Sequence, residues 1–433
     1  MRGTQWWRGH LLSGFQWFFF IFCNTVVVPP TLQSAFHLSP SVTFCITQYT
    51  FLATAIACLF QVMFGHQRAL MEGPTGLWWV TILTLTLAES ANGTPLPVIG
   101  GSLAIGIMLS GIVTILIGLT GLGHRLAKLF RPAVMGTFMF LLGAQLVTIF
   151  MKGMLGLPFG VYSGPIIINY PAFSLAMVIM ALIVMVIIFL PQSIGKYALL
   201  IGAVVGWVSY SLIFRPDILN IESHEWLLFP LGAPQDLRPG IIISALLTGV
   251  INISNTFGAI RGTDHFYGEQ PASNALYRRS FVSSGLLTFC SAPLGVVPFS
   301  PFVSSIGLIT QTQDSSRRSF IIGSLLFLLV GAVAPLVRFF CGIPLTISSA
   351  VMLVSYLPLL YSAFFFFNQV TIHPRNIYRL AFPLFLGIFF MSIPPAFLHS
   401  IPVMIRPLLS NGLLIGVIVS VVLENLLPWE RIK

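Results

Sequence analysis

Runs of about 20 apolar residues recur along the whole chain, and each is long enough to cross the roughly 30 Å hydrocarbon core of a membrane as a helix. The stretches between these runs are too short to form a separate soluble domain. Only 7% of the 433 residues are charged and the mean hydropathy is +0.94, so a soluble surface could not be covered. The sequence therefore predicts an all-α polytopic membrane protein.

The formal net charge of +10 does not point to nucleic acid as a partner. Lys and Arg residues lie in short clusters between apolar runs, where the positive-inside bias of membrane proteins places them, and no basic helix with interleaved aromatic residues occurs. The five cysteines fall within apolar runs without CxxC or Cys/His spacing, so we expect no metal site. The first apolar run is predicted to be a transmembrane helix rather than a removable signal peptide.

Fourteen membrane spans are predicted from the apolar runs and the polar breaks between them. The first seven are 11–30, 41–64, 74–90, 98–120, 132–151, 172–190 and 196–214, and the last seven are 239–260, 280–298, 303–313, 319–341, 343–366, 377–396 and 407–427. With a cytoplasmic N-terminus, 16 of the 21 Lys and Arg residues fall on the cytoplasmic side. This bias supports the count, and we expect an inner-membrane protein with both termini in the cytoplasm.

A weak internal repeat relates the two halves. Asn24-Thr25 in the first span resembles Asn255-Thr256 in the eighth, at an offset of 231 positions, and Gly76 in the third span corresponds to Gly307 in the tenth at the same offset. Seven spans per repeat, an odd number, would place the halves in opposite orientations. This is the inverted-repeat architecture of secondary transporters, whose cargo sites lie between broken helices near the membrane midplane.

The short third and tenth spans are where the broken helices are expected. Each follows a stretch unsuited to regular helix, residues 72–74 and 298–301, in which proline removes backbone donors and glycine or serine allows close approach of a ligand. Half-helices starting there would present free N–H groups to a polar cargo. The alternative is a pair of ordinary proline kinks in packed helices.

At these positions the chain resembles the nucleobase–ascorbate transporter family, also called the uracil/xanthine permeases or nucleobase:cation symporter-2 family. The resemblance rests on Gln16-Trp17 followed by residues 26–29, on residues 255–258, and on residues 304–307 with the later Thr312, and it covers nearly the whole chain. Residues 71–74, 260–264 and 428–431 are particularly similar to purine permeases of enteric bacteria.

The resemblance implies fourteen segments in two inverted repeats of seven, with a short strand before each half-helix. A core domain would contain spans 1–4 and 8–11, from residues 1–130 and 234–341, and a gate domain would contain spans 5–7 and 12–14, from residues 131–233 and 342–433. It further implies alternating access, proton symport, a homodimer in the lipid bilayer, and a purine cargo of the xanthine, hypoxanthine or urate type, without a cofactor.

Several family positions carry other residues here. The eighth-span Glu of the family corresponds to Asn255, and the His found in some members four residues later corresponds to Ala259. The acidic or Gln residue and the Asn of the tenth-span motif correspond to Ser304 and Ser305, and the first-helix His to Trp17. These departures affect the expected cargo and its coupling to protons more than the fold.

A nucleobase is flat and edged with hydrogen-bond donors and acceptors, so its site needs an apolar slot with a few placed polar groups. Asn255 offers an amide donor and acceptor without a charge. The predicted cargo-binding residues come from the broken helices and the two repeated asparagines; they are Asn255, Ser304, Ser305, Thr75, Gly76, Gly307, Phe257 and Asn24. No residue is predicted to be catalytic. For the aromatic residues, ordinary helix packing is the alternative.

Glu72 is a carboxylate beside the first break, where the family position is uncharged. Two interpretations stay open: Glu72 replaces the lost carboxylate as the proton-coupling group, or it pairs with Arg68 one helical turn away. Other functions also stay open, namely a uracil or inorganic-anion carrier and a membrane sensor that has lost transport. An enzyme is not expected, because HExxH, GxSxG and phosphate-binding motifs are missing from the sequence.

Overall fold

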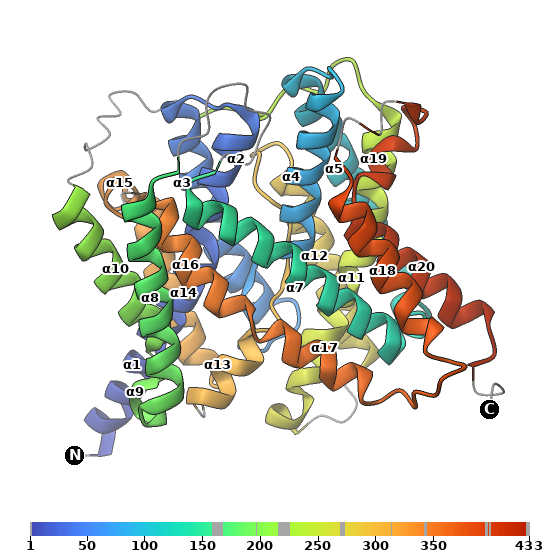
Figure 1. The fold of residues 1–433 in the computed structure, drawn as a ribbon. Helices are drawn as coiled ribbons and strands as arrows, with labels where there is room; N and C mark the ends of the chain where they lie inside the picture. Colours follow the sequence, from blue (N-terminus) through green and yellow to red (C-terminus); the bar gives the residue numbers. More distant parts are fainter. Residues whose placement is uncertain are drawn as a thin grey trace.

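The structure, a computed structural model, describes residues 2–157, 168–195, 197–214, 226–268, 273–312, 314–341, 344–394, 397 and 400–429. Each predicted span overlaps at least one helix (Figure 1). In the first half these helices are α1 (Arg2–Val26) with α2 (Val28–Phe36), α3 (Pro40–Met63), α4 (Gly76–Ala91), α5 (Leu96–Thr120), α7 (Pro132–Leu155), α8 (Tyr170–Phe189) and α10 (Ala198–Phe214).

The second half repeats the pattern of long and broken helices. Its helices are α11 (Pro239–Tyr267), α12 (Asn274–Ser291), α13 (Ser305–Thr312), α14 (Arg317–Ala332), α15 (Ala334–Cys341), α16 (Leu345–Tyr356), α17 (Leu359–Phe367), α18 (Tyr378–Ser392) and α20 (Gly412–Leu426). Three short helices lie between the longer ones: α6 (Gly123–Ala127), α9 (Gln192–Gly195) and α19 (Arg406–Leu409). Counting α1–α2 and α16–α17 as continuous, seven of the described helices are long and apolar enough to cross a membrane.

Proline explains most places where the helices depart from the predicted spans. The first span is interrupted at Val27, just before Pro29, and the span predicted at 343–366 is interrupted before Leu359 by Pro358. The span predicted at 280–298 ends as a helix at Ser291, because Pro293 and the turn at Gly295 follow it. Proline lacks the backbone donor that a continuing helix requires, so these breaks follow from local chemistry.

The two predicted short strands are present and pair with each other. Strand β1 (Glu72–Pro74) and strand β2 (Phe299–Pro301) form a two-stranded antiparallel sheet in which Glu72 lies opposite Pro301 and Gly73 opposite Ser300. Both strands are buried, although each comes from a different half of the chain. Because α4 follows β1 and α13 follows β2, this sheet brings the starts of both half-helices together.

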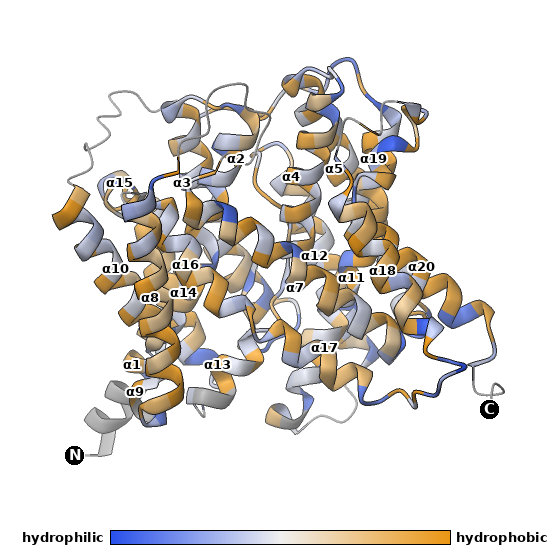
Figure 2. Ribbon diagram, viewed as in Figure 1, coloured by the Kyte–Doolittle hydropathy of each residue, from blue (hydrophilic) through white to orange (hydrophobic). Residues whose placement is uncertain are grey.

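The helices pack in two groups, and the sheet contacts helices of the first, namely α1, α3, α11 and α12. In one group α5 packs on α11 and α12 while α1 and α3 pack on α14; in the other α7 packs on α16, α17, α18 and α20, and α8 packs on α10 and α16. Glycines let the first group pack closely: a Cβ on Gly111 of α5 would lie 2.8 Å from the carbonyl oxygen of Gly285 of α12. Peripheral helices such as α8 are hydrophobic along most of their length (Figure 2), as lipid contact requires.

Candidate functional site

The starts of α4 and α13 are fixed by hydrogen bonds that reach across the small sheet. Thr75 precedes α4, where its backbone N–H donates to the Pro298 carbonyl at 3.0 Å and its hydroxyl accepts from the Trp78 N–H at 3.2 Å. At the start of α13, the Ser305 hydroxyl accepts from the Met71 N–H at 3.0 Å. Each half-helix start is therefore tied to backbone from the other half of the chain.

A cavity of about 780 Å³ lies at these two helix starts. It is bounded by α1, β2, α7, α8, α11, α13, the starts of α4 and α10, and the region where α16 meets α17. Five of the predicted cargo-binding residues line it: Thr75, Gly76, Asn255, Ser304 and Gly307. The lining extends to the exposed side chains of Leu12 and Phe15, at the end of the molecule where α1 begins.

The other predicted cargo-binding residues lie outside the lining of this cavity. The Ser305 hydroxyl accepts from the Met71 N–H, and the Asn24 amide donates to the carbonyl of Phe20 in its own helix at 2.8 Å. Phe257 packs edge-to-face against Phe281 instead. These residues hold the surrounding structure together rather than face the cavity.

Sequence reasoning missed one complete face of α1. Gln16, Phe19, Phe20 and Cys23 all line the cavity, and their spacing of three or four residues is that of one helix face. Tyr356 also lines it, from the end of α16. The helical spacing on α1 is a signal that could have identified the first four residues, whereas nothing in the local sequence marks Tyr356.

The polar groups of the cavity are uncharged and incompletely bonded. Asn255 donates from Nδ2 to Asn252 Oδ1 at 3.0 Å, which leaves its own Oδ1 as an acceptor. The Nε2 of Gln16 and the hydroxyl of Ser300 are buried, with no hydrogen-bond partner in the described structure. None of the described residues that line the cavity carries a charge. The cavity therefore presents separate amide and hydroxyl groups between apolar and aromatic walls, including Phe302.

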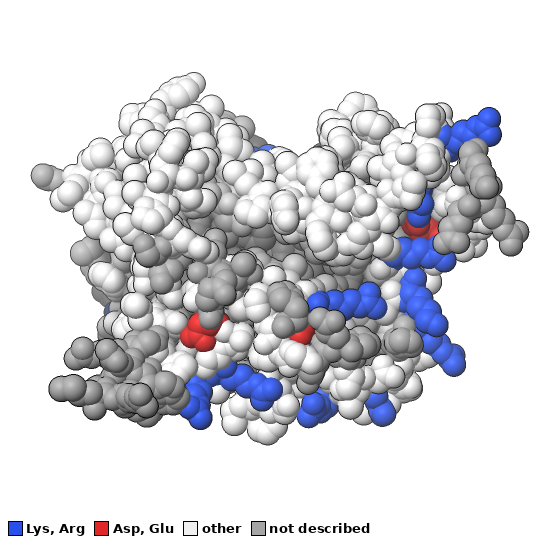
Figure 3. All heavy atoms as spheres, turned by 90° about the horizontal axis from the view of Figure 1, so that it is seen from below, with Lys and Arg blue, Asp and Glu red and all other residues white. Residues whose placement is uncertain are grey.

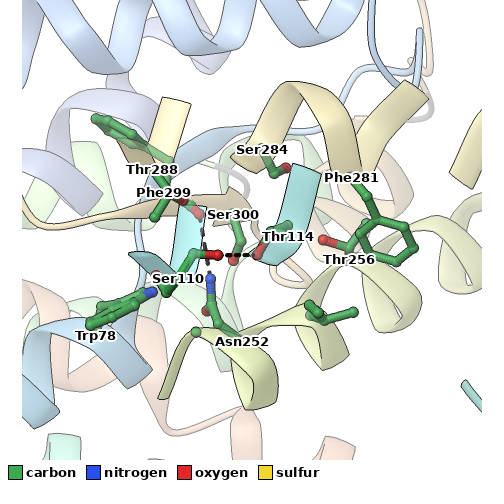
Figure 4. A pocket seen from close by; sticks show the side chains of 12 residues that line it. Trp78, Ser110, Thr114, Asn252, Thr256, Phe281, Ser284, Thr288, Phe299 and Ser300 are labelled. Atoms are coloured by element: carbon green, nitrogen blue, oxygen red, sulfur yellow. Dashed lines mark hydrogen bonds between the residues drawn. The ribbon is translucent and has the colours of Figure 1, made fainter. Parts of the chain in front are cut away.

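A second, much smaller cavity lies beside the first, between α5, α11, α12 and β2. Its volume is about 10 Å³, and most of its lining side chains carry a hydroxyl, an amide or an indole N–H (Figure 4). Asn252 reaches it and donates from Nδ2 to the Phe299 carbonyl at 3.4 Å. Ser300 lines both cavities, whereas the indole of Trp78, which has a buried and unpartnered Nε1, lines the small one.

Glu72 is fully buried, and of its two interpretations the pairing with Arg68 is wrong. Its Oε1 accepts from the Ser284 hydroxyl at 3.0 Å, whereas Arg68 forms an ion pair with Asp264 at 2.7 Å. The carboxylate of Glu72 therefore has a neutral hydroxyl partner instead of a guanidinium.

His66 lies close to Arg68, and its Nδ1 accepts from the backbone N–H of Arg68. Burial, with a smaller contribution from Arg68, lowers the pKa of His66 to about 3.

A buried ion pair joins the far end of α4 to α19. Both carboxylate oxygens of Glu89 accept from Arg406, each at 2.9 Å, and Thr94 adds a third bond at 3.2 Å. Nearby, the Asn411 amide donates to the Thr81 hydroxyl at 2.9 Å. Glu89 is completely buried although it lies at the end of the predicted third span, where the sequence alone is compatible with a solvated side chain.

Comparison with known proteins gives one consistent result. A family model described as the permease family, that of the xanthine/uracil permeases, matches residues 8–396. Over 434 residues the chain is 26% identical to "Putative purine permease YwdJ" of Bacillus subtilis, with 98% of this chain and 97% of that protein covered. It is 21% identical over 436 residues to "Nucleobase transporter PlUacP" of Paenibacillus larvae, covering 98% and 95% of the two chains.

Among solved structures, the fold is similar to the transmembrane domain of the cyanobacterial bicarbonate transporter BicA. The TM-score is 0.59 at 17% identity, with 95% of this chain and 97% of that chain covered. At this identity the similarity shows the fold alone, namely two inverted repeats of seven segments. The fold class predicted from the internal repeat is thereby confirmed.

Proposed function

This chain belongs to the xanthine/uracil permease family, whose members are transporters rather than enzymes, and from that premise we propose that it carries a purine nucleobase across the membrane. The observation that carries the proposal is the uncharged cavity of about 780 Å³ at the two half-helix starts. It has the size of a small-molecule site and the mixture of apolar walls and a few polar groups that such sites use. The purine names of the relatives support the choice of cargo.

The polar groups suit the edge of a purine. Asn255 supplies an acceptor, Gln16 a donor, and Ser300 and Ser304 hydroxyls that can act as either. At the start of α4 the N–H of Gly76, which lines the cavity, adds a further donor, whereas the first N–H groups of α13 already donate to nearby backbone carbonyls. Phe302 and the aromatic residues of α1 and α16 provide flat surfaces against which a ring can stack. A neutral heterocycle satisfies these groups without bringing an unpaired charge into the membrane.

Alternating access follows from the two groups of helices around the cavity. We infer that the group containing α1, α3–α5 and α11–α14 is the core domain, and that the group containing α7, α8, α10, α16–α18 and α20 is the gate domain. The cavity lies where the two meet. The transport step would then be movement of one group against the other around a cargo held by the half-helices.

The orientation is inferred from charge. Lys and Arg side chains gather on the face seen from below in Figure 3, which is the end at which α1 begins. Placing this face in the cytoplasm of a bacterial cell satisfies the positive-inside bias and puts both termini there. In this orientation the cavity opens inward, and the Glu89–Arg406 pair closes the outer side. Proton symport and a homodimer complete the proposal on the strength of family resemblance.

An inorganic anion is the second candidate, because half-helix starts bind anions in many proteins. The uncharged lining argues against it, since no described side chain in the cavity offers a positive charge to balance an anion. The binding experiment described next separates a nucleobase carrier from an anion carrier.

Ligand binding to the purified protein in detergent tests the proposal. A bound cargo stabilises the folded state by mass action, so the unfolding temperature should rise with xanthine, hypoxanthine, urate or adenine, rise less with uracil, and stay unchanged with bicarbonate or sulfate. Stabilisation by an anion without any response to a base would replace the nucleobase assignment with an anion carrier.

A further inference from the structure

The structure places a polar route between the cargo cavity and the buried carboxylate of Glu72. Ser300 lines both the large and the small cavity, and Asn252, which accepts from Asn255 of the large cavity, also lines the small one. Ser284 forms part of the opposite wall of the small cavity and donates to Glu72 Oε1 at 3.0 Å. Polar groups therefore follow one another from the cargo site to Glu72.

The small cavity has the properties of a site for one water molecule. Its volume of about 10 Å³ is close to the minimum that holds a water, which also requires two to four polar partners. Two unsatisfied groups are available in its wall, the indole N–H of Trp78 and the hydroxyl of Ser300. Ser284 can be a third partner, because its oxygen already accepts from Gln61 at 2.8 Å and retains a second lone pair.

Glu72 itself lacks the environment of a permanently charged group. Its side chain is fully buried, and its Oε2 accepts no hydrogen bond from the described residues. The elements around it are β2, which has no ionisable residue, and α1, α3 and α12; the thiol of Cys58 on α3 donates to the Glu72 backbone carbonyl at 3.2 Å. The described ion pairs of Arg68, Arg379 and Arg406 all involve other carboxylates.

We propose that water in the small cavity connects the cargo cavity to Glu72, and that Glu72 takes up and releases the transported proton along this route. The proposal rests on the proposed function, because it names the coupling group of that same transport cycle. Glu72 would thereby replace the carboxylate and histidine that the eighth span lacks at Asn255 and Ala259.

The proton moves as a relay, in which the water and Ser284 each accept one proton and release another. A proton from the cargo cavity enters on the water, which passes a proton to Ser284 Oγ while the hydroxyl proton of Ser284 moves to Glu72 Oε1. The serine is unchanged, the carboxylate of Glu72 becomes a neutral acid, and one positive charge has moved from the cargo cavity to Glu72. The reverse transfer returns the proton when the cavity faces the other side of the membrane.

Two transport assays on the protein reconstituted in liposomes separate coupling from cargo movement. Exchange of labelled for unlabelled purine requires only the cargo site and alternating access, whereas accumulation driven by an imposed proton gradient also requires the proton route. We expect Glu72→Gln to keep exchange within about threefold of wild type and to lose gradient-driven accumulation by tenfold or more, together with its pH dependence. Ser284→Ala should give the same split and applies even if Glu72→Gln does not insert.

Ser280→Ala is the matched control. Ser280 lies one turn before Ser284 on α12 and is equally buried, but it does not line the small cavity, so both assays should match wild type. Gradient-driven accumulation by Glu72→Gln with wild-type pH dependence would overturn the proton route. Wild-type exchange without any gradient-driven accumulation would also overturn it while leaving base transport intact, whereas neither activity with any base would remove the proposed function itself.

Discussion

Replacing Asn255 by alanine is expected to lower purine uptake by about fivefold or more in cells that lack other base carriers. The substitution removes the amide acceptor of the cargo cavity and also leaves Asn252 Oδ1 without its donor. A buried polar group that loses its partner costs about 1–3 kcal/mol, which corresponds to roughly fivefold to 150-fold in affinity. Initial uptake rates of labelled xanthine, hypoxanthine and urate measure the effect.

Asn24→Ala is the control for this prediction. Asn24 is the equivalent asparagine of the first repeat and is also buried, but its amide bonds to its own helix outside the cavity. Uptake by this variant should stay within about threefold of wild type. Equal losses in the two variants at equal membrane levels would mean that Asn255 supports the fold and does not contact the cargo.

Arg406→Ala is expected to destabilise the protein by about 3–5 kcal/mol, since it leaves the buried carboxylate of Glu89 without its two charged hydrogen bonds. The loss should appear as a lower unfolding temperature of the purified protein. Because the pair joins α4 to α19 on the proposed outer side, its loss should also increase labelling of a cysteine introduced at Thr81 by a membrane-impermeant reagent added outside.

Two further variants separate the loss of this pair from the loss of a charge. Arg238→Ala removes an exposed arginine at the same end of the molecule and should leave stability within about 0.5 kcal/mol of wild type. In the double variant Glu89→Ala/Arg406→Ala no charge remains buried alone, so part of the lost stability should return. An Arg406→Ala protein that is as stable as wild type and is labelled no faster would show that the pair neither stabilises the fold nor closes the outer side.

The fold was largely predictable because membrane helices are encoded by composition and proline placement. The starts of α4 and α13 were found from Pro74 and Pro301, since proline cannot donate to a continuing helix. The separation of α14 from α15 at Val333 was missed, although Pro335 follows it by two residues. An unbroken apolar run hides such a break, because hydropathy does not register the backbone donor that proline lacks.

The site was predictable only where a polar residue interrupts an apolar helix, as Asn255 does. Phe257 was predicted with it, but two residues along a helix turn a side chain by about 200°, which points it away from the cavity and toward Phe281. The ion pair of Glu89 with Arg406 joins positions more than 300 residues apart, so no local pattern could reveal it. Ser284 and Glu72 are 212 residues apart, so no local pattern could reveal their contact either.

Concentrative uptake in liposomes tests the central claim most directly. Purified protein would be reconstituted, an inward proton gradient imposed, and the internal concentration of labelled xanthine, hypoxanthine, urate and bicarbonate followed with and without a protonophore. Transport of a purine through the uncharged cavity predicts that at least one purine rises above its external concentration and that the protonophore abolishes the rise. Accumulation of bicarbonate alone, or of no solute by a folded protein, would contradict the account.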